Sequence, residues 1–132
     1  MGFFTLPLTR RFNHVVAVES HSTAAADLHT NTGIAVGRVH PYSISAEAFV
    51  ETRAARQAWD VIVVDPPRHG LAAPVRGALA ELLPKQIVYV SCDPTTLARD
   101  VAVLSTSGYQ MESIHLIDLF PQTYHLEARS EE

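Results

Sequence analysis

Short apolar runs alternate along this chain with longer stretches of helical periodicity. The strand candidates are rich in β-branched residues and occupy positions 15–18, 38–44, 61–64, 87–90 and 111–119. The helical stretches lie between them, at positions 20–32, 46–58, 75–82 and 94–107. Strands that alternate with helices in this way are typical of an α/β fold with a mostly parallel sheet flanked by helices.

Capping residues mark several of the predicted boundaries. Ser45 and Asp93 stand where an N-cap is expected, and Pro94 suits the first position of a helix. Gly33 is expected to end the helix that precedes it. Pro41 weakens the second strand candidate, because proline cannot donate to a sheet.

Composition narrows the class of protein. The 132 residues leave room for one domain, and 47% apolar and 18% charged residues make it globular. The single cysteine excludes an internal disulfide, and no histidines have the spacing of a metal site, so no metal is expected. Without a membrane-spanning segment or a signal peptide, we expect a cytoplasmic protein with no membrane partner.

The charge balance gives no general attraction to nucleic acid. The formal net charge is -4, and basic residues do not gather in one run. If this domain acts on nucleic acid, most of the binding must come from elsewhere.

The only cysteine, Cys92, stands where a predicted strand gives way to a helix. Ligands of open α/β sheets bind at this carboxyl edge. The positive end of the helix dipole favours the nucleophilic thiolate, whereas the neighbouring Asp93 disfavours a second negative charge. Taken alone, a lone cysteine is more often a small buried hydrophobic residue.

Acidic residues follow other strand candidates, namely Glu19, Asp65 and, after a loop, Glu127. Because the carboxyl ends of parallel strands share one edge, we expect these residues to converge with Cys92 on one cleft. Glu19 suits ribose hydroxyl groups or, equally well, the dipole at a helix start. Two prolines after Asp65 stiffen the chain and favour a binding role for this carboxylate.

Several segments carry a family resemblance. In order, they are Gly2-Phe3-Phe4-Thr5-Leu6-Pro7-Leu8, Val15 to Glu19, Val64-Asp65-Pro66-Pro67-Arg68, Tyr89-Val90-Ser91-Cys92-Asp93-Pro94 with Thr96-Leu97-Ala98-Arg99-Asp100, and Phe120-Pro121 to His125-Leu126-Glu127. Together they resemble the S-adenosylmethionine-dependent RNA uracil-5-methyltransferases that modify tRNA and ribosomal RNA. The resemblance covers almost the whole chain and implies that residues 1–132 are a single, partial methyltransferase catalytic domain.

The resemblance implies a Rossmann-like class I methyltransferase fold and roles for individual residues. It makes Cys92 the nucleophile, which adds to C6 of uracil and so activates C5, and Glu127 the base, which removes the C5 proton. Asp65 would hold the polar edge of the uracil, and Arg68 would help to position it or a phosphate group. The target base in the tRNA or rRNA partner must be flipped out or already unstacked.

The implied cofactor is S-adenosyl-L-methionine. The resemblance assigns its ribose to Glu19, and Gly2 would let the backbone approach its methionine end. Phe4, Thr5 and Asp65 complete the implied cofactor site.

The chain departs from the family pattern at both ends. The first central strand of the sheet is expected to be lacking, and so is the last strand, because residues 128–132 look too short and polar to form one. Both losses would leave backbone groups unpaired. Asp93 also stands where asparagine is common, and Tyr124 where glycine is common. We expect the isolated chain to bind the cofactor poorly and to be nearly inactive; calorimetric titration would test this.

Other interpretations stay open. The chain could be a non-catalytic fragment that serves as an interaction or scaffold module, with a homodimer formed through its open sheet edges. It could also be an α/β methyltransferase with a different target, although amino-methylating enzymes usually have an aromatic residue where Arg68 stands. A cysteine hydrolase is the weakest alternative, since no motif pairs Cys92 with a particular histidine.

Overall fold

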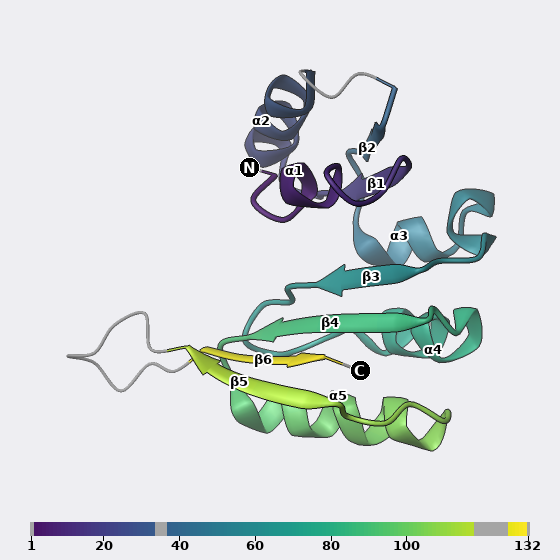
Figure 1. The fold of residues 1–132 in the computed structure, drawn as a ribbon, viewed down its shortest axis with the longest axis vertical. Coiled ribbons are helices and arrows are strands. Elements are labelled where there is room, and N and C mark those ends of the chain that lie inside the picture. Colours follow the sequence, from purple (N-terminus) through teal and green to yellow (C-terminus); the bar gives the residue numbers. More distant parts are fainter. Residues whose placement is uncertain (1, 34–36, 118–126, 132) are drawn as a thin grey trace. The chain divides into compact units, whose positions relative to one another are not determined.

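The computed structural model describes residues 2–33, 37–117 and 127–131. The chain divides into two compact units, Met1–Ala55 and Arg56–Glu132. Each unit contains its own sheet in the described residues (Figure 1). That the two form one catalytic domain stays a prediction.

The first unit pairs two parallel strands and packs helices beside them. It contains α1 (Thr5–Leu8), β1 (Val15–Val18), α2 (Ser22–Thr32), β2 (Val39–Tyr42), α3 (Ala46–Val50) and the start of a 3-10 helix, η2 (Arg53–Arg56). The buried residues of α2 are Ala24, Ala25, Leu28 and Thr32, whose hydroxyl group donates to Leu28 O at 2.7 Å. Pro41 is tolerated because β2 pairs only with β1 among the described residues.

The second unit holds the mixed sheet on which the candidate site is built. Its elements are β3 (Val61–Val64), α4 (Ala73–Leu82), β4 (Gln86–Ser91), α5 (Pro94–Thr106), β5 (Ser113–Ile117) and β6 (Glu127–Glu131). The strands lie in the order β3-β4-β6-β5 (Figure 1). β3 runs parallel to β4, whereas β6 is antiparallel to both β4 and β5.

The core of this unit lies between β4 and the helices α4 and α5. Ile87 and Tyr89, two positions apart on β4, are each 1% exposed and point to the same face of the sheet. Leu79 of α4 and Leu104 of α5 pack in the same cluster. Both helices therefore cover one face of the sheet, as the periodicity of their apolar positions predicts.

The expectation that the last strand is lacking is wrong. Residues 127–131 form β6, which is inserted between β4 and β5 and pairs with both. A strand with neighbours on each side is stabilised by main-chain hydrogen bonds that do not depend on its own apolar content. The polar composition of this segment therefore concealed it. Among the described residues, β1 and β2 form one sheet and the other strands form a second, and the expectation that the first central strand is lacking stays a prediction.

The single helix predicted over 46–58 is also wrong, because α3 ends at Val50 and η2 follows. The Thr52 hydroxyl group donates to Phe49 O at 2.7 Å and accepts from Ala55 N at 3.3 Å. A threonine side chain that bonds to nearby backbone groups competes with helical hydrogen bonds, and here it interrupts them. The Ser45 cap is confirmed, since its hydroxyl oxygen accepts from Ala48 N.

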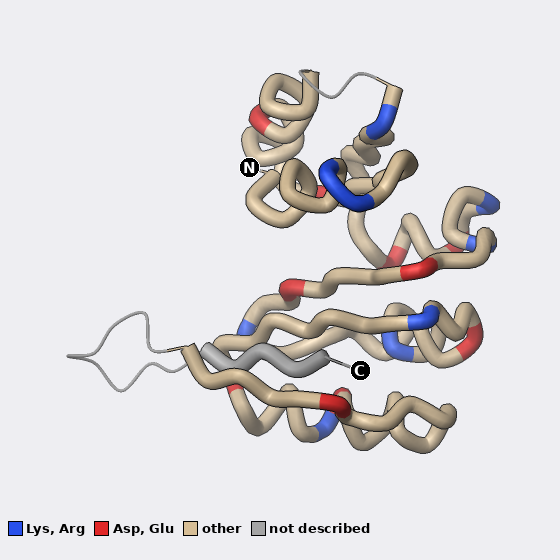
Figure 2. The backbone as a smooth tube through the Cα atoms, in the orientation of Figure 1, with Lys and Arg blue, Asp and Glu red and all other residues tan. Residues whose placement is uncertain are grey.

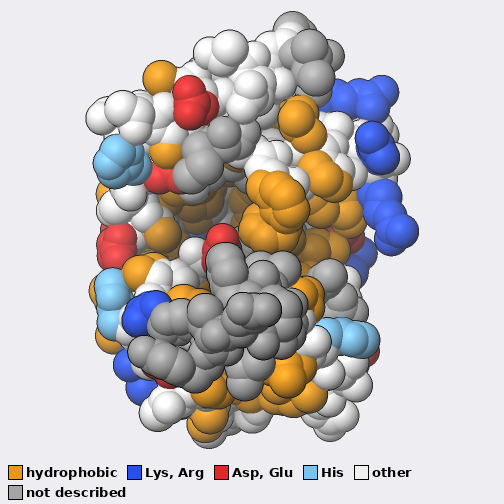
Figure 3. Space-filling model, turned by 90° about the vertical axis from the view of Figure 1, so that its left-hand side faces the viewer, with side chains coloured by type: hydrophobic (Ala, Val, Ile, Leu, Met, Phe, Trp, Pro, Cys, Tyr) orange, Lys and Arg blue, Asp and Glu red, His pale blue; other side chains and the backbone are white. Residues whose placement is uncertain are grey.

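The surface of the described residues mixes side chains of all kinds. Basic and acidic positions are dispersed along the backbone (Figure 2), and apolar side chains remain visible among polar ones on the face shown in Figure 3. The large exposed apolar residues include Ile114 and Leu116 of β5. Within the described ranges, no helix combines the length and apolar character that crossing a membrane requires.

Candidate active site

The Cys92 turn is built by side chains on either side of the cysteine. Ser91 Oγ accepts from Asp93 N at 3.1 Å and donates to Asp93 O at 2.9 Å. Asp93 Oδ1 in turn accepts from the backbone N–H groups of Thr95 at 2.8 Å and Thr96 at 3.0 Å, which confirms the predicted N-cap. Cys92 is exposed and is not in a disulfide. Its thiol is thus presented at the carboxyl end of β4 rather than packed into the core.

Hydrogen bonds from the helix that Asp93 caps stabilise the charged form of its carboxyl group. The N–H of Thr96 lowers the pKa of Asp93 most, desolvation opposes this, and the N–H of Thr95, the Thr96 side chain and the charge of Arg68 lower it further. Arg68 therefore acts electrostatically on the turn that carries Cys92, although it follows a different strand.

The segment after β3 is held by α5 rather than by its own hydrogen bonds alone. Thr96 Oγ1 donates to Arg68 O at 3.0 Å, and Arg99 Nη2 donates to His69 O at 3.0 Å. Two residues further on, Leu71 N donates to Asp100 Oδ2 at 2.7 Å. One helix thus fixes the backbone directly after the Asp65-Pro66-Pro67-Arg68 motif.

Asp100 is the buried centre of these contacts and is 0% exposed. Its Oδ2 accepts from Tyr89 Oη at 2.6 Å as well as from Leu71 N. Its Oδ1 accepts from Arg76 Nη1 at 3.0 Å and from Nε and Nη2 of Arg99 at 2.9 and 2.7 Å. Every donor that a buried carboxylate needs is therefore supplied.

The surroundings of Asp100 and Tyr89 determine the direction in which the pKa of each side chain is shifted. Desolvation alone would raise the pKa of Asp100, but the hydrogen bonds from Tyr89, Leu71 N and Arg99, with the charge of Arg99, hold it below its usual range. Burial raises the pKa of Tyr89 well above its ordinary value, and the Asp100 carboxylate raises it further. At neutral pH the phenol is a donor and the carboxylate an acceptor.

The backbone of Glu127 lies at the same edge of the sheet as Cys92. Ser91, which precedes Cys92, is paired with Ala128, which follows Glu127. Because these strands are antiparallel, the end of β4 lies beside the beginning of β6. Cys92 and Glu127 therefore occupy neighbouring positions at this edge, whereas Phe120, Tyr124 and His125 lie outside the described residues.

All but one of the residues predicted for the cofactor lie in the first unit, and Asp65 lies in the second. Gly2 has φ +94°, and a Cβ there would lie 3.4 Å from Leu28 Cδ1, so glycine suits this position. Phe4 is the residue before α1, and Thr5 is its first residue. Glu19 directly follows β1, and its Oε1 accepts from His21 N at 2.8 Å. Glu19 thus has the position predicted at a helix start, since His21 is the N-cap of α2.

Sequence reasoning identified the residues of the strand ends but missed those that hold them. Asp65 and Cys92 follow β3 and β4 within one unit, as predicted. Asp100 belongs to a quoted motif but was given no role, although it shares the buried face of α5 with Leu97, Val101 and Leu104. An acidic residue at a core position of an amphipathic helix was the available signal.

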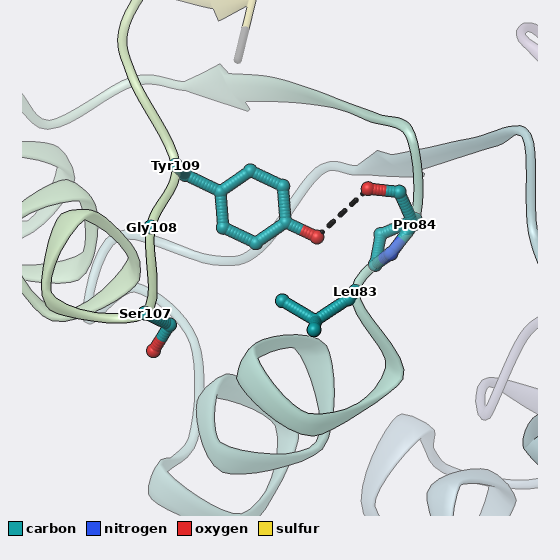
Figure 4. Close-up of a pocket in the computed structure, with 5 residues that line it drawn as sticks. All are labelled: Leu83, Pro84, Ser107, Gly108 and Tyr109. Carbon is teal, nitrogen blue, oxygen red and sulfur yellow. Dashed lines mark hydrogen bonds between the residues drawn. The ribbon is translucent and has the colours of Figure 1, made fainter.

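A shallow hollow lies elsewhere in the second unit, lined by Leu83, Pro84, Ser107, Gly108 and Tyr109 (Figure 4). The hydroxyl group of Tyr109 donates to Pro84 O across it at 2.9 Å. Pro84 precedes β4, whereas Cys92 follows it, so the hollow is at the opposite end of that strand and apart from the candidate site.

Comparison with known proteins decides the family. Residues 1–130 match the tRNA (Uracil-5-)-methyltransferase family. The chain belongs to this family. It is 40% identical over 131 residues to the 23S rRNA (uracil(1939)-C(5))-methyltransferase RlmD of Aeromonas salmonicida, covering 97% of this chain and 29% of that protein. It is also 40% identical over 129 residues to an uncharacterized RNA methyltransferase of Aquifex aeolicus, covering 97% of this chain and 30% of the relative.

A solved structure supports the same assignment. The Pyrococcus abyssi tRNA (uracil-54, C5)-methyltransferase, determined with S-adenosyl-L-homocysteine, aligns with a TM-score of 0.83 at 32% identity. The alignment covers 98% of this chain and 31% of that one. The predicted Rossmann-like methyltransferase fold is thereby confirmed. The chain spans roughly a third or less of the length of these family members.

Proposed function

We propose that this chain carries the catalytic residues of an RNA uracil-5-methyltransferase, with Cys92 as nucleophile and Glu127 as base. The observation that carries the proposal is the exposed Cys92 turn at the end of β4, with Glu127 beginning the adjacent antiparallel strand. Family membership supplies the substrate class. Together they favour an enzyme over an interaction module.

C5 of uracil is a poor nucleophile, so the reaction must first raise the electron density at this atom. The Cys92 sulfur forms a bond to C6, and the ring electrons that this displaces make C5 nucleophilic. S-adenosylmethionine, when bound, supplies an electrophilic methyl group to C5 and leaves as S-adenosylhomocysteine. Glu127 then accepts the C5 proton. The electron pair of that C–H bond restores the C5–C6 double bond, and the Cys92–C6 bond breaks to release the thiolate.

The neighbouring residues fit substrate and cofactor binding. Asp65 and Arg68 sit on the segment after β3, where they would hold the polar edge of the uracil and orient the base. Glu19 at the end of β1 suits ribose hydroxyl groups, and the positive φ of Gly2 suits a close backbone approach. Phe4, Thr5 and Asp65 would complete the cofactor site. The solved relative with S-adenosyl-L-homocysteine supports this class of cofactor.

Covalent trapping on RNA that contains 5-fluorouridine tests the mechanism. Fluorine at C5 cannot leave as a proton, so the Cys92–C6 bond persists after methyl transfer. We expect a protein–RNA adduct that requires S-adenosylmethionine and is absent in Cys92→Ala. Transcripts of tRNA and of 23S rRNA segments, used in parallel, decide between the two kinds of RNA that the names of the relatives contain.

Glu127→Gln provides a second, independent readout. With ordinary uridine, this variant should transfer the methyl group but retain the adduct, because no base removes the C5 proton. The experiments are run on the chain alone and on a chimera in which it replaces the matching 29% of the Aeromonas relative. An adduct that persists in Cys92→Ala, or no adduct in either form, would show that the proposal is wrong.

A further inference from the structure

Helix α5 holds the backbone that follows the Asp65-Pro66-Pro67-Arg68 motif through contacts one turn apart. Thr96 binds the carbonyl group of Arg68, and Arg99 binds that of His69. Asp100 then accepts from the N–H of Leu71. Three side chains of α5 are thus hydrogen-bonded to backbone groups of this loop.

The loop packs so closely against α5 that a side chain would not fit at Gly70. This residue has φ +75°, and a Cβ there would lie 2.6 Å from both Arg99 Nη2 and Asp100 Oδ2. Its N–H donates to Pro67 O at 2.8 Å, which closes the turn. The loop therefore approaches α5 closely because it lacks a side chain at this point.

Asp100 also contacts the strand that precedes Cys92, and it lies on the helix that follows the cysteine. Tyr89, which donates to Asp100, lies three residues before the cysteine on β4, and α5 begins two residues after it. Asp100 thus ties together the strand that leads to the nucleophile, the helix that leaves it, and the loop that carries the uracil-binding residues.

We propose that Asp100 is a positioning residue for methyl transfer, which holds the loop carrying Asp65 and Arg68 in register with Cys92 before RNA binds. The inference rests on the proposed function, since it concerns the same reaction. It adds that the substrate loop is preformed rather than ordered by RNA. Preorganisation of this kind lowers the entropic cost of placing the uracil against the sulfur.

If Asp100 only stabilised the fold, loss of its contacts would lower stability without a separate effect on the reaction. The test therefore removes the exposed hydrogen bonds between α5 and the loop. Thr96→Val removes the hydroxyl group that binds Arg68 O and keeps the side-chain shape. Thr106→Val is the matched control, because Thr106 lies on the same helix and its hydroxyl group donates to Val103 O of that helix rather than to the loop. Arg99→Lys, with Arg56→Lys as its control at the exposed Arg56–Glu81 pair, gives a second comparison.

Three measurements are made on each variant. Hydrogen exchange at the amides of Gly70 and Leu71 reports on loop opening. The maximal rate of adduct formation on 5-fluorouridine RNA, at saturating RNA, reports on positioning. It is measured on the isolated chain or on the chimera, whichever forms the adduct with the wild-type sequence. Alkylation of the only cysteine by iodoacetamide reports on the thiol itself, which matters because Thr96 Oγ1 also lies 3.2 Å from Asp93 O.

We expect Thr96→Val to speed loop exchange and to lower the maximal adduct rate by roughly threefold to tenfold, as expected for one hydrogen bond. Arg99→Lys also alters the bonds from Arg99 to Asp100, so it should speed exchange and lower the rate at least as much. Alkylation and the controls should stay at wild-type values. Faster exchange with an unchanged adduct rate would overturn the proposal, and so would unchanged exchange. A wild-type chain and chimera that both form no adduct would instead refute the proposed function, before any variant is compared.

Discussion

The hydroxyl group of Tyr89 donates a hydrogen bond of 2.6 Å to Oδ2 of Asp100, and both residues are almost completely buried. The bond joins β4 just before Cys92 to α5 just after it. Because the acceptor is a charged carboxylate without solvent, this is one of the stronger kinds of hydrogen bond in a protein. The turn that presents Cys92 is therefore stabilised by a buried polar contact and not by apolar packing alone.

Tyr89→Phe should destabilise the second unit by about 1–3 kcal/mol, since it leaves a buried carboxylate oxygen with one donor fewer. Urea unfolding measures the change. Tyr109→Phe is the matched control, because Tyr109 donates to the uncharged carbonyl group of Pro84 at 2.9 Å, in a partly buried place. We expect the control to cost about 0.5–1.5 kcal/mol. Equal losses for the two variants would contradict the importance of the charge.

The stability of the fold should depend on pH through Asp100. Its pKa in the folded chain is lowered, so its contribution is present above the unfolded pKa of about 4 and is lost as pH falls through the folded value. Asp100→Asn should cost about 3 kcal/mol at pH 7. The difference between wild type and variant, followed by urea unfolding at decreasing pH, should shrink below about pH 4. A difference that does not change with pH would contradict this prediction.

Local patterns predicted most of the elements because their causes lie close in sequence. β1 and β3 have the bounds that their β-branched runs predict, and Ser45 and Asp93 cap their helices as expected. In each case the decisive interaction joins residues a few positions apart. The α/β class followed from this alternation.

The parts that could not be predicted depend on contacts between distant segments. The pairing of β6 with β4 joins residues near 90 and 130, and no property of the polar segment 127–131 reveals it. The role of Asp100 likewise depends on Leu71, which lies 29 residues away. The sequence therefore indicated which residues end the strands, while the contacts that hold those ends required the structure.

Gly70→Ala should be strongly destabilising, because the new Cβ would lie 2.6 Å from two polar side-chain atoms at a positive φ. We expect a loss of about 2–4 kcal/mol, from strain and from the displaced bonds to Asp100. Gly77→Ala is the matched control: Gly77 lies within α4 and a Cβ there meets nothing within 4 Å. This control should instead gain about 0.5–1 kcal/mol, because alanine favours a helix. Thermal unfolding compares the two, and losses of similar size would contradict the close approach of the loop to α5.

Leu83, the C-cap that follows α4, is in the left-handed conformation, with φ 46° and ψ 55°, and it is 59% exposed. A side chain with a Cβ is strained in this conformation, whereas glycine adopts it freely. Leu83→Gly should therefore stabilise the chain by roughly 0.5–1 kcal/mol, after the greater freedom of glycine in the unfolded chain is subtracted. Leu83→Ala separates the causes, because it removes the same side-chain contacts beside Tyr109 but keeps the Cβ and its strain. We expect no gain from alanine, and a gain of equal size would show that backbone strain is not the cause.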